Sequence, residues 1–162
     1  MMNFPTINRL IILALLFLGT SKLSAQVRPI NFNELKGLQQ KEQRLVMVLV
    51  GTEWCKYCNA MKNSILRDKN LKVPLTTSFY TVFLNAEDKN PIVFADRVFN
   101  YKPTGVNTGV HQLAEALATI QGQVSYPSLV FLNYKNEIVY QNAGFLDPAK
   151  LKTLLNTLQK IN

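Results

Sequence analysis

The only two cysteines of the chain, Cys55 and Cys58, follow directly on a run of six apolar residues at 45–50. A continuous, largely β-branched run of this kind is typical of a strand that is covered on both faces. Gly51 and Thr52 then turn the chain. If it is helical from Glu53, positions i and i+3 lie on one face about 5–6 Å apart at Cβ, close to the reach of a disulfide. We therefore expect a buried central strand, then a helix whose first turn holds a reversible disulfide.

Four further stretches have the composition of strands. Residues 79–84 form a second apolar and aromatic run that ends in polar, turn-prone residues. Residues 129–132 and 137–140 flank a polar turn, which predicts an antiparallel hairpin. Residues 27–30 favour a short edge strand.

Four helices are expected around these strands. The first follows a cap at Asn31 or Asn33, the second covers 53–69, and the third covers 109–120 with Thr108 as its cap. The fourth begins at Asp147 and Pro148, a typical pair of cap and first helical residue. Its apolar stripe consists of Leu151, Leu154, Leu155, Leu158 and Ile161.

Residues 89–108, between the second strand and the third helix, are expected to be irregular because they contain Pro91, Pro103 and Gly105. A loop of this length is usually functional or mobile. Its aromatic residues indicate that part of it packs on the domain, as a flap bordering the active site.

The first 25 residues have the layout of a secretory signal peptide, in which Arg9 precedes an apolar run at 10–18. A membrane-spanning helix needs about 20 apolar residues, and no cysteine lies near Ala25 to carry a lipid. We therefore expect cleavage after Ala25, one domain over 26–162 and no stable membrane anchor. The expected location is the periplasm if the source is Gram-negative, and otherwise outside the cell, where disulfides persist.

The net charge of +8 comes from basic residues that are scattered along the chain. Without a dense basic run, a solvated surface is favoured over nucleic-acid binding. One histidine and two cysteines make a poor zinc site, so the expected cofactor is none beyond a redox-active disulfide. His111, at the start of the third helix, is expected to be a surface or boundary residue without a role.

The order of helix, strand, redox helix, strand, helix, hairpin and helix resembles the thioredoxin fold. The residues that carry the resemblance are Glu53-Trp54-Cys55-x-x-Cys58 after the apolar strand, Tyr126-Pro127 before the hairpin strand and Gly144 before the last helix. It covers about residues 27–162 and is nearest to exported thioredoxin-like proteins. It implies an α/β fold with a central mixed sheet of four to five strands flanked by helices, and an insertion before the third helix.

Thiol–disulfide exchange needs an attacking thiolate, and a helix N-terminus favours negative charge. Cys55 is therefore expected to be the nucleophile, with Lys56 acting in the same direction. Cys58, one turn into the helix and less exposed, would resolve the mixed disulfide. The alternative is a static disulfide or two inert thiols, but a bond closing so short a loop constrains the unfolded chain little.

Three supporting residues are expected beside the dithiol. In the family that the chain resembles, the proline matching Pro127 is cis and faces the dithiol, and a trans edge proline is the alternative. Tyr126 would offer backbone groups to an extended substrate. Trp54 would shield the site or contact substrate, with a core-capping role as the alternative.

The chain departs from thioredoxins at Leu49, where they have a buried aspartate that assists proton transfer with the second cysteine. Glu53 is the nearest carboxylate in sequence and is expected to be exposed, and water is a second candidate. Lys56-Tyr57 is neither the Gly-Pro of thioredoxins nor the Pro-His of strong periplasmic oxidants. The direction of electron flow stays open.

The sequence thus predicts an exported thiol–disulfide oxidoreductase, with reductase or isomerase activity favoured over primary oxidation. Its expected partners are exported proteins with thiols or disulfides and a membrane or soluble electron donor. The alternative is a thioredoxin-fold peptide-binding module or chaperone that holds unfolded chains without redox turnover.

Overall fold

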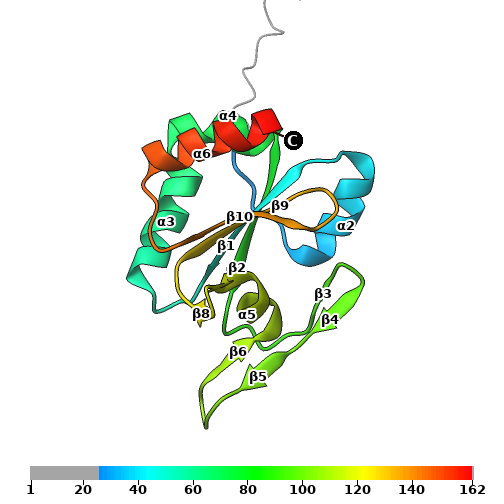
Figure 1. Cartoon of the computed structure of the whole chain (residues 1–162), viewed down its shortest axis with the longest axis vertical. Helices are drawn as coiled ribbons and strands as arrows, with labels where there is room; N and C mark the ends of the chain where they lie inside the picture. The colour runs from blue at the N-terminus through cyan, green and yellow to red at the C-terminus, as the bar shows by residue number, and fades with distance from the viewer. Residues whose placement is uncertain (1–25, 162) are drawn as a thin grey trace, which may run out of the picture.

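A four-stranded mixed sheet lies at the centre of the computed structural model, which describes residues 26–161 (Figure 1). Its strands, in spatial order, are β10 (Ile138–Ala143), β9 (Ser128–Leu132), β1 (Leu45–Gly51) and β2 (Phe79–Asn85). β1 pairs parallel with β2 and antiparallel with β9, and β9 with β10 forms the expected antiparallel hairpin. The predicted α/β fold with a mixed central sheet is confirmed.

Helices cover both faces of this sheet, because the side chains of β1 alternate between two cores. Val46, Val48 and Val50 face α2 and α5, while Leu45, Met47 and Leu49 face α3, α4 and α6. The helices of the described chain are α2 (Phe32–Lys41), α3 (Lys56–Arg67), α4 (Lys69–Thr77), α5 (Gln112–Ala118) and α6 (Pro148–Ile161).

The first and last helices begin at caps that the sequence indicated. Asn31 Oδ1 accepts the backbone N–H of Glu34, and the Glu34 carboxylate returns to the Asn31 backbone, which completes a capping box. Asp147 Oδ1 accepts the backbone N–H of Lys150 at 2.9 Å. That hydrogen bond lowers the pKa of the Asp147 carboxyl.

The helix expected over 53–69 is shorter than predicted and is followed by another. α3 begins at Lys56 with Cys55 as its cap, and Asp68 caps α4. α4 was not expected, because Pro74 within it lacks the N–H of a regular helical residue. The edge strand expected at 27–30 is reduced to a single bridge between Ile30 and Val82.

The segment expected to be irregular, 89–108, is instead built from short hairpins. β3 (Ile92–Phe94) pairs with β4 (Arg97–Phe99), and β5 (Tyr101–Pro103) pairs with β6 (Gly109–His111). Figure 1 shows both hairpins, with β5 and β6 extending furthest from the sheet. A further pair, β7 (Thr119–Ile120) and β8 (Gln123–Val124), follows α5.

The third predicted helix therefore starts later than expected, and His111 rather than Thr108 caps it. The prediction that His111 lies at the surface or at its boundary is wrong, because the residue is fully buried. Its Nδ1 accepts the N–H of Leu113, and its Nε2 lies 3.2 Å from the carbonyl oxygen of Asn90. Both ring nitrogens have partners, which makes burial of this polar side chain tolerable.

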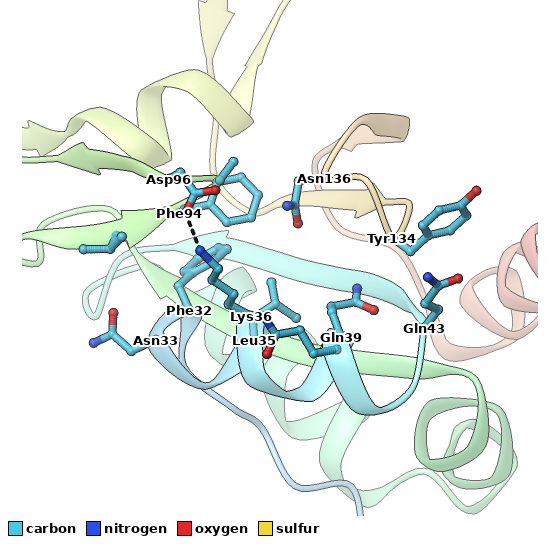
Figure 2. Close-up of a pocket in the computed structure, with 13 residues that line it drawn as sticks. Phe32, Asn33, Leu35, Lys36, Gln39, Gln43, Phe94, Asp96, Tyr134 and Asn136 are labelled. Carbon is cyan, nitrogen blue, oxygen red and sulfur yellow. Dashed lines mark hydrogen bonds and ion pairs between the residues drawn. The ribbon is translucent and has the colours of Figure 1, made fainter.

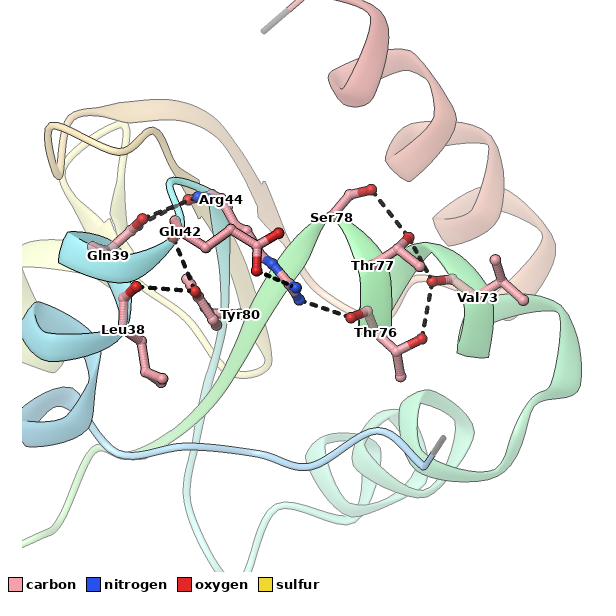
Figure 3. Close-up of polar contacts among 9 residues, drawn as sticks. All are labelled: Leu38, Gln39, Glu42, Arg44, Val73, Thr76, Thr77, Ser78 and Tyr80. Carbon is pink, nitrogen blue, oxygen red and sulfur yellow. Dashed lines mark hydrogen bonds and ion pairs between the residues drawn. The ribbon is translucent and has the colours of Figure 1, made fainter. Parts of the chain in front are cut away.

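A polar network ties the end of α2 to β2 and α4 (Figure 3). Arg44 Nη1 donates to the carbonyl oxygen of Thr76 at 2.7 Å, and Nη2 donates to the Glu42 carboxylate. The Tyr80 hydroxyl donates to the carbonyl oxygen of Glu42 at 2.9 Å. Burial raises the pKa of the Tyr80 hydroxyl. These contacts fix the entry into β1, far along the strand from the cysteines.

Replacement of Leu71 by alanine tests whether α4 is part of the core. Leu71 is fully buried in the α3–α4–α6 core, so Leu71→Ala should lower the free energy of unfolding by about 2–5 kcal/mol. Val73 on the same helix is 66% exposed, and Val73→Ala should change that free energy by no more than about 0.5 kcal/mol. Urea denaturation followed by circular dichroism measures both, and equal losses would contradict this placement of α4.

Candidate active site

Cys55 and Cys58 form a disulfide directly after β1 ends at Gly51. The Sγ–Sγ distance is 2.05 Å and the Cα–Cα distance is 5.2 Å. The turn between strand and helix is closed by the Cys55 N–H, which donates to the carbonyl oxygen of Thr52 at 3.3 Å. The sequence prediction of a bond between these two residues is confirmed.

Cys55 is the N-cap of α3. Its Sγ accepts the backbone N–H of Cys58 at 3.1 Å, so the sulfur occupies the position at which a capping oxygen normally lies. Unpaired N–H groups and the helix dipole favour negative charge there. The first turn of α3 contains no acidic residue, and Lys56 within it is exposed.

The two cysteines are almost equally buried, with exposed fractions of 7% for Cys55 and 5% for Cys58. Cys58 is less exposed than Cys55, as expected, but the difference is small. Gly51 packs directly against Cys58, since a Cβ at this glycine would lie 2.8 Å from Cys58 Sγ. The backbone at the end of β1 thus lies so close to Cys58 Sγ that a side chain at position 51 would clash with it.

Exposed aromatic rings flank the dithiol. Trp54 is 69% exposed, and its Nε1 donates to the carboxylate of Glu87 at 3.1 Å. Tyr57 is equally exposed and lies against Phe145, with ring centroids 6.3 Å apart. The core-capping alternative for Trp54 does not hold. Neither Glu87 nor Phe145 was identified from the sequence, because both lie far from the cysteines along the chain.

Pro127 follows a cis peptide bond and is buried at the same edge of the sheet. Ser128 pairs with Val50 in the antiparallel register, so Pro127 lies opposite the end of β1, where the cysteine turn begins. Tyr126 packs against the α2–α5 core, and burial, followed by the charges of Glu87 and Glu115, raises the pKa of its hydroxyl. Its hydroxyl oxygen is therefore buried within the protein, although the residue as a whole is only partly buried.

The insertion reaches the side of the dithiol turn. A cavity of about 400 Å³ is lined there by Glu53, Glu87 and Asp88 together with Tyr101 and Asn107 of the β5–β6 hairpin. The hairpin thus borders the site as the sequence suggested, although as ordered strands rather than an irregular flap.

A family model described as a thioredoxin-like domain matches residues 32–159, which include the cysteine turn, the insertion and most of α6. The chain belongs to the thioredoxin-like domain family. No curated protein matches its sequence.

Solved structures agree with this assignment at the level of the fold. A thioredoxin from Thermus thermophilus is 23% identical, with a TM-score of 0.58 over 83% of this chain and 88% of its own. A DsbH oxidoreductase is 15% identical, with a TM-score of 0.57 over 86% and 90% of the two chains. A disulphide isomerase from Xylella fastidiosa is 16% identical, with a TM-score of 0.52 over 78% and 86%.

Within this thioredoxin-like domain, Leu49 is 4% exposed and lies on the face of β1 that packs against α3 and α6. Together with Cys58 it lines a cavity of about 140 Å³ behind the disulfide, and Phe83 forms part of the wall. Glu53, at the edge of this cavity, is exposed as expected. The buried position that the resemblance assigns to an acid is therefore apolar.

A larger cavity, of about 460 Å³, lies between α2, the β3–β4 hairpin and the β9–β10 turn (Figure 2). Phe32, Leu35 and Phe94 line it, and an ion pair between Lys36 and Asp96 joins α2 to the hairpin. None of its lining residues belongs to the cysteine turn.

Over residues 26–161, no three His, Cys, Asp or Glu side chains gather closely enough to hold a metal ion. In the same part of the chain, no helix has both the length and the apolar character to cross a membrane. The predicted signal peptide at 1–25 lies outside the described residues.

The close approach of Gly51 to Cys58 predicts a specific cost of a methyl group. Gly51→Ala should lower the free energy of unfolding of the oxidised protein by about 1–3 kcal/mol, because Cys58 or the end of β1 must shift. Gly37 in α2 has no described atom within 4 Å of a Cβ, so Gly37→Ala should raise that free energy by about 0.5–1 kcal/mol. Urea denaturation decides; equal stability of Gly51→Ala and the parent would show that the two residues are not in contact.

Proposed function

We propose that this thioredoxin-like domain is an exported thiol–disulfide oxidoreductase that exchanges disulfides with other exported proteins. The observation that carries the proposal is the position of Cys55 Sγ at the N-terminus of α3, where it accepts the Cys58 N–H. A thiolate at this position is stabilised by the helix, and a stabilised thiolate is the attacking species in disulfide exchange.

In the reductive direction, the Cys55 thiolate attacks one sulfur of a substrate disulfide. A Cys55–substrate disulfide forms, and the other substrate sulfur leaves with the electron pair. Cys58 then loses its proton and attacks Cys55 Sγ, which forms the Cys55–Cys58 bond and releases the second substrate sulfur as a thiolate. The two electrons come from the dithiol, which a membrane or soluble electron donor must reduce again.

The surroundings of the dithiol suit a protein substrate. The exposed rings of Trp54, Tyr57 and Phe145 offer apolar area on either side of the cysteine turn. Pro127, opposite the end of β1, and the backbone of Tyr126 lie where an extended segment could pair with little dependence on its sequence. The scattered charge of +8 does not favour nucleic acid as a partner.

The names of two structural neighbours, an oxidoreductase and a disulphide isomerase, agree with this class of reaction. We favour reductase or isomerase activity because Glu53-Trp54-Cys55 matches the sequence of ordinary thioredoxins at this position. Export rests on the signal-peptide layout of residues 1–25, and a periplasmic or secreted location would supply partners with disulfides.

Single-cysteine variants test the roles of the two thiols. Cys58→Ser, reduced and mixed with an oxidised protein substrate, should accumulate a mixed disulfide, because Cys55 attacks but cannot be resolved. Cys55→Ser is the matched control and should trap little. Non-reducing gel electrophoresis with mass spectrometry identifies the adduct, and no adduct with Cys58→Ser would refute Cys55 as the nucleophile.

The reduction potential of the Cys55–Cys58 pair decides the direction of electron flow. Equilibration of Cys55–Cys58 with glutathione should give a reduction potential near the thioredoxin range of about −270 mV, while a value near about −120 mV would indicate an oxidant.

A chaperone without redox turnover is the remaining alternative. It would be favoured if the double variant Cys55→Ser/Cys58→Ser kept full activity in a client-folding assay.

A further inference from the structure

Cys58 must lose its proton in surroundings that contain no buried acid. It is 5% exposed, and the neighbouring side chain of Leu49 is apolar. A thiol in apolar surroundings ionises less readily than one in water. Some other group has to receive the proton and stabilise the charge.

The cavity behind Cys58 supplies room for that group. Its volume of about 140 Å³ is well above the roughly 10–15 Å³ that a cavity needs in order to hold one water. Thr52 lines the same cavity and is 5% exposed. Its Oγ1 is buried and has no hydrogen-bond partner among the residues that the structure describes. A buried hydroxyl without a protein partner beside a roomy cavity is a typical site for an ordered water.

The charged groups facing the cavity do not replace this hydroxyl. Glu53 precedes α3 and is exposed, and Lys62 lies one helical turn beyond Cys58 with Nζ 5.2 Å from the centre of the Phe83 ring. The ammonium of Lys62 favours a thiolate at Cys58 but cannot accept its proton. The residues of β1 and β2 that line the cavity, Leu49, Gly51, Phe83, Leu84 and Asn85, carry no titratable side chain.

We propose that Thr52 is a positioning residue whose hydroxyl holds a water in this cavity, and that this water accepts the Cys58 proton and then donates a hydrogen bond to the thiolate. The inference rests on the proposed exchange reaction and deepens its second step. The proton passes through the water to solvent, the thiolate attacks Cys55 Sγ, and the substrate sulfur leaves with the electron pair of the broken bond.

A titration of Cys58 alone tests the water site without requiring turnover. Cys55→Ser leaves Cys58 as the one cysteine of the chain, so the ultraviolet absorbance of its thiolate can be followed against pH. Adding Thr52→Val should raise the midpoint of thiolate formation by about one pH unit, a tenfold loss of thiolate below the midpoint. Adding Thr52→Ser, which keeps the hydroxyl, should leave the midpoint near that of the parent.

Thr52→Val breaks no hydrogen bond within the described chain and is close in shape, so the variant should fold, which circular dichroism verifies. Glu53, Lys56 and Lys62 stay unchanged in every variant, so their fields are constant. An unchanged midpoint in Thr52→Val overturns the proposal. Equal rises in the valine and serine variants also overturn it, because they would show that the hydroxyl is not what matters.

With both cysteines present, Thr52→Val should slow the decay of the mixed disulfide by about tenfold or more. The first attack, measured in Cys58→Ser with and without Thr52→Val, should keep its rate. Unchanged decay with a parent that reduces disulfides overturns this inference alone. A parent that reduces no disulfide overturns the proposed function, and the Cys58 titration still decides whether Thr52 holds the water.

Discussion

The burial of β1 on both faces is the constraint on which the rest of the structure depends. Every side chain from Leu45 to Val50 is buried, and alternate residues enter the α2–α5 core and the α3–α4–α6 core. A shift by one residue would exchange the two sets, so the register of β1 with β2 and β9 is strongly specified. The register thereby fixes where the strand ends, at Gly51. The turn that carries the two cysteines follows directly, so its position is fixed as well.

Three segments that are distant in sequence meet at that end of the sheet. β1 and β2 are parallel and finish side by side, Gly51 opposite Asn85, while β9 begins there after Pro127. The polar turn after β2 brings Glu87 to the indole of Trp54. The site is thus assembled by strand register, and the N-terminus of α3 supplies the field that acts on Cys55.

Features specified by nearby residues could be predicted from the sequence. The apolar run of β1, the caps at Asn31 and Asp147 and the cysteine spacing are of this kind. α4 was missed because of Pro74, and the β3–β4 hairpin because its strands are short and its turn places Ala95 and Asp96 at positive φ without the usual glycine signal. The burial of His111 depends on the carbonyl oxygen of Asn90, and the contact between Trp54 and Glu87 depends on strand register. Neither could be predicted from neighbouring residues in the sequence.

Leu49 stands at a position where the resemblance to thioredoxins places a buried acid. As a result, the end of β1 contributes to the stability of the core but offers no side chain for proton transfer. A carboxylate on this face of β1 would have to be desolvated among the residues of the α3–α4–α6 core, which is costly without a partner. Leucine removes that cost and continues the apolar run that fixes β1. The polar side chains that line the cavity beside Cys58 then come from the turn, from α3 and from the last residue of β2. They are Thr52, Glu53, Asn59, Lys62 and Asn85. None of these five residues belongs to β1, so the proton transfer proposed for Cys58 is separated from the apolar packing of the strand that holds the dithiol in place.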